Sequence, residues 1–173
     1  AMLALASHEG WPLSGYETMD HPVQTRIIEI LAQMARVPAA SISLGIDGCS
    51  VPVHAMAMQS AATAFARFAD PSGLPAPMQR ACQRLFDAMA THPHMVSGKG
   101  RLCTQLMSTW PGKLVAKAGA EGFYSLGIPA VDGLGQPLLP AQIGILFDIS
   151  KRPADIADHC RGEHSFDCTD IGV

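Results

Sequence analysis

The stretch that decides the fold is residues 113–128, Lys-Leu-Val-Ala-Lys-Ala-Gly-Ala-Glu-Gly-Phe-Tyr-Ser-Leu-Gly-Ile. Two largely apolar runs within it, residues 113–118 and 122–128, have the length and composition of β-strands. The Gly-Ala-Glu segment between them is typical of a tight turn, which predicts an antiparallel hairpin. A third strand is expected at residues 143–149, and the hairpin then becomes an antiparallel sheet.

The residues before this hairpin mostly show the three- and four-residue spacing of helices. Asp20 is the expected N-cap of one helix, with Pro22 in its first turn. Pro52 is expected to open a helix rich in alanine and methionine, and Pro93 to break a later one. The expected helices cover residues 1–8, 22–36, 52–69, 76–90, 101–110 and 153–159, with a short strand at 41–46.

These elements predict one α/β (α+β) unit over residues 1–150, in which helices pack on an antiparallel sheet. No internal repeat or low-complexity linker divides the sequence. Residues 151–173 are expected to form a divergent tail with little order.

Composition excludes several classes of protein. Of the 173 residues, 48% are hydrophobic and 16% are charged, a pattern opposite to that of disordered chains. The net charge of −3 gives no electrostatic reason to bind nucleic acid or an anionic membrane. No apolar run reaches the roughly 18 residues of a membrane span. Five cysteines, without the cationic start of a signal peptide, favour a cytoplasmic location.

Residues 47–50, Asp-Gly-Cys-Ser, are the best local candidate for chemistry. They would lie between a strand and a helix, so that the helix dipole would favour the thiolate form of Cys49. A thiolate is both a nucleophile and a metal ligand. Asp47 would orient a substrate amine or a group bound to the metal. The alternative is a turn aspartate with a buried cysteine.

Lys117 is a second candidate because it ends an otherwise apolar strand. If it were buried, desolvation would favour its neutral form and suit it to move protons or bind an anion. The small residues after it would let a ligand approach the backbone. In the alternative, its stem packs while its ammonium reaches water.

Other groupings are weaker. Residues 97–101, Ser-Gly-Lys-Gly-Arg, lack the spacing of a nucleotide-binding loop, although two basic residues at a helix start could hold a phosphate or carboxylate. Cys160, His164 and Cys168 match no standard zinc spacing. No serine is followed three residues later by lysine, and no Gly-x-Ser-x-Gly occurs, so the sequence shows no recognisable serine nucleophile.

Four segments, taken in order, resemble the rhizobial-type L-asparaginase II family. They are residues 20–24 (Asp-His-Pro-Val-Gln), 45–52 (Gly-Ile-Asp-Gly-Cys-Ser-Val-Pro), 101–107 and 114–122, followed by Gly127. The resemblance runs from residue 1 to about residue 128. It implies a fold similar to part of the serine β-lactamases and penicillin-binding proteins. It also implies hydrolysis of asparagine to aspartate and ammonia by a serine in a Ser-x-x-Lys motif.

The same resemblance implies roles for three residues. Cys49 matches a zinc-binding cysteine, Asp47 an acidic residue that shapes the substrate pocket, and Lys117 an active-site lysine. Cys103 matches a position that is cysteine in some members and takes no assigned role. The family's Cys-x-Gly-Lys-His motif, with the other zinc ligands, does not occur in this sequence.

Two functions are therefore expected as alternatives. In the first, the chain carries the C-terminal half of an asparaginase site, is inactive alone, and acts on a small amide such as asparagine. It would then associate as a homo-oligomer, for example a dimer, or with a missing N-terminal half. In the second, it is a non-catalytic α/β module that binds zinc or a small ligand. A phosphate-binding protein that uses Lys99 and Arg101 is a third, weaker reading.

Overall fold

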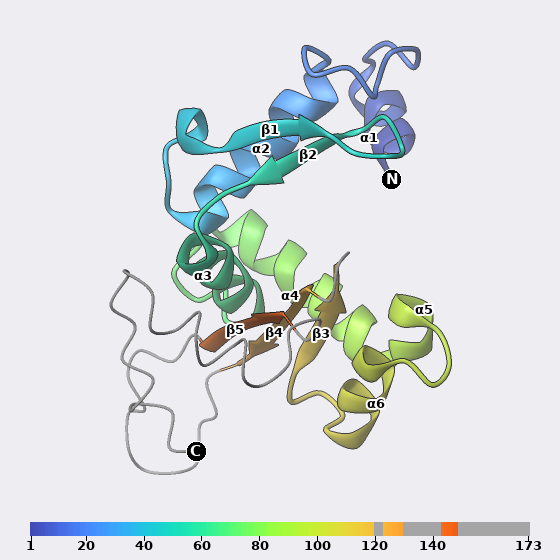
Figure 1. The fold of residues 1–173 in the computed structure, drawn as a ribbon, viewed down its shortest axis with the longest axis vertical. Helices are drawn as coiled ribbons and strands as arrows, with labels where there is room; N and C mark the ends of the chain where they lie inside the picture. The colour runs from blue at the N-terminus through green and yellow to red at the C-terminus, as the bar shows by residue number, and fades with distance from the viewer. Residues whose placement is uncertain (120–122, 130–142, 149–173) are drawn as a thin grey trace.

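The structure is a computed structural model that describes residues 1–119, 123–129 and 143–148. Its described part combines helices with two small antiparallel sheets, which confirms the predicted mixed fold class. In Figure 1 the two-stranded hairpin and the first two helices occupy one end of the view, α3 lies in the middle, and the three-stranded sheet lies beyond α3. The expected helix at residues 153–159 and the tail at 151–173 fall outside the described residues.

Helix α1 (Met2–Glu9) ends as the sequence predicts. Gly10 closes it with φ 71°, and its N–H bonds to the last carbonyls of the helix. The N–H of Trp11 then donates to the carbonyl of Ala6 at 2.8 Å. This left-handed glycine cap satisfies helix-end carbonyls that would otherwise lack partners.

The N-cap of helix α2 (Pro22–Ala35) lies one residue later than predicted. His21, and not Asp20, is the N-cap: its Nδ1 accepts from the Val23 N–H at 3.2 Å. The other ring nitrogen, Nε2, lies 2.9 Å from the carbonyl oxygen of Pro12. Because one nitrogen accepts and the other faces an acceptor, these contacts assign the neutral Nε2–H tautomer.

The segment from Pro52 does not form the predicted helix start. Strand β1 (Ser43–Ile46) pairs antiparallel with strand β2 (Pro52–Ala55), with Gly45 opposite Val53. Helix α3 (Met58–Ala69) begins only after this strand. Proline suits the first position of a strand as well as that of a helix, and the alternation after it is that of a strand.

Helices α4 (Ala76–Thr91) and α6 (Leu102–Thr109) lie close to their predicted positions. Between them is a helix that was not expected, α5 (Pro93–Ser97). Pro93 opens this helix instead of only ending the previous one, since a first-turn proline needs no N–H partner.

The three predicted strands are confirmed as β3 (Val115–Ala118), β4 (Phe123–Ile128) and β5 (Ile143–Asp148). They pair antiparallel in the order β3-β4-β5. The register sets Lys117 opposite Ser125 and Val115 opposite Gly127. This sheet packs against α3 and α6.

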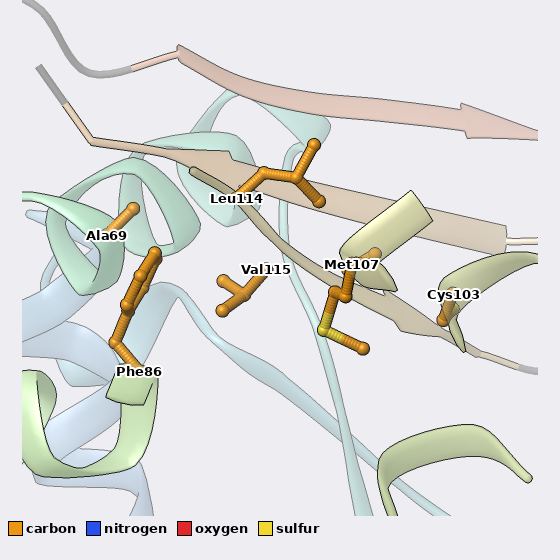
Figure 2. Close-up of a cluster of buried hydrophobic side chains, with 7 residues drawn as sticks. Ala69, Phe86, Cys103, Met107, Leu114 and Val115 are labelled. Atoms are coloured by element: carbon orange, nitrogen blue, oxygen red, sulfur yellow. The ribbon is translucent and has the colours of Figure 1, made fainter. Parts of the chain in front are cut away.

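The main core lies between the sheet and the helices. Figure 2 shows the Val115 side chain between that of Phe86 on one side and that of Met107 on the other. The buried members of this main core are Ala69, Phe86, Cys103, Met107, Leu114, Val115 and Ala116. A smaller cluster of Met34, Leu74 and Cys82 joins α2 to the α3–α4 segment. Among the described helices, none is long and apolar enough to cross a membrane.

Candidate functional site

The Asp-Gly-Cys-Ser segment is the connecting turn of the β1–β2 hairpin. The Ser50 N–H donates to the Asp47 carbonyl at 2.9 Å, and the Asp47 N–H donates to the Val51 carbonyl at 3.0 Å. Ser50 has φ 67°, the left-handed conformation that closes a hairpin with a three-residue loop. The turn therefore holds Asp47 and Cys49 in a defined, exposed loop.

Within this turn the aspartate and the cysteine are in contact. Asp47 Oδ1 accepts from the Gly48 N–H at 2.7 Å. Asp47 Oδ2 lies 3.7 Å from Cys49 Sγ, which can donate to it. The carboxylate is thus oriented by its own backbone and keeps lone pairs that face solvent.

The expectation that Cys49 lies at a helix N-terminus is wrong. The turn leads into β2, and α3 begins only at Met58, so no helix dipole acts on this thiol. The alternative expectation, a buried cysteine, is also wrong, because Cys49 is exposed.

The turn fits only part of a zinc site. Zinc sites in proteins take three or four side-chain ligands, and the turn supplies one sulfur and one carboxylate. Nowhere in the described residues do three His, Cys, Asp or Glu side chains gather as a metal site would require. Cys103 is fully buried in the main core and is not available as a ligand.

Lys117 lies on β3 and is exposed, as its simpler reading predicted. Its Nζ donates to the carbonyl of Ala118 at 2.7 Å. The Ser125 hydroxyl, almost fully buried on β4, donates to the carbonyl of Lys117 at 3.1 Å. The backbone of this lysine is therefore held firmly while its ammonium stays in reach of solvent and ligand.

The structure places Lys117 apart from the other two candidates. In Figure 1 the β1–β2 hairpin lies on the α1–α2 side of α3, and β3 lies on the far side. Within the described residues, no hydrogen bond or ion pair joins Lys117 to Asp47 or Cys49. The three do not form one closed site by themselves.

The contacts of Arg67 and the burial of His54 were not anticipated. Arg67 on α3 is buried, and its guanidinium donates to the carbonyls of Gln33 and Met34 at the end of α2. His54 on β2 is half-buried, and burial lowers the pKa of its imidazole. Among the described residues its Nε2 finds no hydrogen-bond partner. The contacts of Arg67 with α2 join residues 33 and 34 positions apart and leave no local sequence signal.

Comparison with known families gives one match. The family model described as L-asparaginase II matches residues 1–138 of the chain. No curated protein matches the chain.

Proposed function

Because residues 1–138 place this chain in the L-asparaginase II family, we propose that it contributes to the hydrolysis of the side-chain amide of asparagine. The products would be aspartate and ammonia. The family match supports an asparaginase-type activity, and the roles of individual residues are our own assignment.

In the proposed reaction a serine hydroxyl attacks the side-chain amide carbon, and ammonia leaves as that carbon forms an ester with the serine. Water then hydrolyses the ester, which releases aspartate and restores the hydroxyl. The serine is proposed to come from residues outside these 173, because no serine here has a lysine three residues later.

Asp47 is proposed to bind the substrate. Its carboxylate is oriented by the Gly48 N–H and is exposed, so it can accept hydrogen bonds from the α-ammonium of asparagine. Lys117 is proposed to act in catalysis from β3, where its exposed ammonium can stabilise negative charge on the substrate. Since the two lie apart in this chain, residues from outside it would have to complete the pocket between them.

The test is ammonia release from L-asparagine after the chain is mixed with the N-terminal segment of an L-asparaginase II enzyme. We expect turnover that Lys117→Ala and Asp47→Asn remove. Lys113→Ala, at an exposed lysine just before the same strand, is the matched control and should keep the activity. Equal activity in Lys117→Ala and Lys113→Ala would refute the role of Lys117.

A second candidate function is zinc binding at Cys49, with further ligands from a partner. The observation in its favour is an exposed thiol 3.7 Å from a carboxylate oxygen. Zinc content would be measured after dialysis by elemental analysis, in the same mixture with the N-terminal segment. Stoichiometric zinc that is lost in Cys49→Ser and kept in Cys82→Ala would support it. Zinc that survives Cys49→Ser would exclude this ligand.

A further inference from the structure

A second candidate site lies in the N-terminal part of the chain, within residues 5–29. Between α1 and α2 the structure has an open, solvent-exposed cavity of about 500 Å³, whose charged lining residues are all on the surface. Leu5 of α1 and Trp11, which follows that helix, supply apolar and aromatic lining. The proposed amide chemistry does not use this cavity.

The charges that line the cavity come from separate segments. Glu9 belongs to the end of α1, Asp20 to the loop before α2, and Glu29 to α2 itself. Arg26 also lines it and forms an ion pair with Glu29 at 3.3 Å. Three carboxylates and one guanidinium leave a formal charge of −2.

Two of these carboxylates are available to a ligand. Neither Glu9 nor Asp20 has an ion-pair partner in the part of the chain that the structure describes. Asp20 is exposed, and interaction with the Thr18 side chain lowers the pKa of its carboxyl, which favours the charged form.

The arrangement discriminates between kinds of cation. A bare metal ion needs converging ligands, and these carboxylates do not gather as a metal site among the described residues. A larger organic cation does not need converging ligands, because its charged end can pair with a single carboxylate. It can also place its carbon chain on an aromatic face, where a positive charge is attracted by the ring.

We propose that this cavity binds an alkylammonium ion, with its charged end near Glu9 and Asp20 and its carbon chain against Trp11 and Leu5. An anion of the same length is rejected by the net negative lining. A neutral ligand of that length gains only the apolar contact.

The test uses n-pentylammonium and pentanoate at neutral pH, two probes that share a chain length and differ in charge. Binding is followed by the indole N–H signals in nitrogen–proton NMR spectra of the full chain. The sequence has two tryptophans, and the exposed Trp110 after α6 serves as the internal control. We expect a saturable shift of the Trp11 signal with n-pentylammonium and none with pentanoate.

Variants then assign the charge. Asp20→Asn and Glu9→Gln should each weaken binding by about two- to fivefold, whereas Asp87→Asn on α4 should leave it unchanged. A circular dichroism spectrum equal to that of the original chain shows that each variant is folded. Equal shifts with the two probes, equal shifts of both tryptophans, or equal affinity in Asp20→Asn and Asp87→Asn would each overturn the proposal.

Discussion

The guanidinium of Arg67 donates a hydrogen bond to the main-chain oxygen of Met34 over 3.1 Å, so that a cation from α3 caps the end of α2. It also donates to the carbonyl of Gln33. These carbonyls belong to the last turn of a helix, where a positive charge is favoured by the dipole. Burial lowers the pKa of Arg67, and its paired carbonyls offset the cost of placing the charge there.

Replacing this arginine should destabilise the chain. Arg67→Met keeps most of the side-chain length but leaves the buried carbonyl of Met34 and the partly buried carbonyl of Gln33 without their donor, which should cost about 2 kcal/mol of unfolding free energy. Urea unfolding followed by circular dichroism measures it. Arg84→Met, at an exposed position of α4, is the control and should change stability by less than about 0.5 kcal/mol. Equal stability of the two variants would contradict the capping role.

Gly127 should not tolerate a side chain. A Cβ at this position would lie 3.0 Å from the Cβ of Ala69 and 3.1 Å from the carbonyl oxygen of Phe65. Because both atoms belong to the rigid packing of α3 on β4, Gly127→Ala should cost about 1–3 kcal/mol. Gly73→Ala, where a Cβ meets nothing within 4 Å, is the control for thermal unfolding. A melting temperature that Gly127→Ala leaves unchanged would show that α3 and β4 are not packed this closely.

The three described cysteines should react at different rates. Cys49 is exposed, whereas Cys82 and Cys103 are buried. Burial also raises the pKa of the Cys82 thiol, an effect that nearby Arg67 partly offsets, and so disfavours its reactive thiolate. Brief iodoacetamide treatment followed by peptide mass spectrometry should modify Cys49 first. Rapid modification of Cys82 in the folded chain would contradict its placement in the smaller cluster with Met34 and Leu74.

His54 should make stability depend on pH. Burial lowers the pKa of its imidazole below the unfolded value, so the unfolded chain binds the proton more readily. The contribution of neutral, half-buried His54 to the free energy of unfolding is therefore fully present above pH about 6.5, and it is lost as the pH falls below that value. His54→Gln should flatten this part of the stability profile, measured by urea unfolding from about pH 5 to about pH 8. A profile as steep as that of the wild type would place the sensitivity elsewhere.

The sequence predicts the three-stranded sheet well because its signals are local. Residues 113–128 contain both strands, and the structure confirms the pairing of β3 with β4. Residues 120–122 of the predicted turn lie outside the described residues. The prediction of a helix from Pro52 was wrong because an alanine-rich segment after a proline has helix propensity. In the structure this segment instead pairs with β1. Strand pairing overrode propensity there.

The candidate site was predicted only in part. The turn at residues 47–50 is where the sequence indicates, but the surroundings of Cys49 are set by the strand β2 that the turn leads into. The contact between Arg67 and Met34 joins residues 33 positions apart and has no sequence signature. Whether Lys117 is buried also depends on packing across the sheet, which no window of sequence shows.

The central claim is that this chain carries part of an asparaginase site whose nucleophile lies outside it. Ammonia release from L-asparagine tests it most directly, measured for the chain alone and for its mixture with the N-terminal segment of an L-asparaginase II enzyme. We predict no release by the chain alone, and release by the mixture that Lys117→Ala abolishes. Clear turnover by the chain alone, or none in the mixture, would contradict the claim.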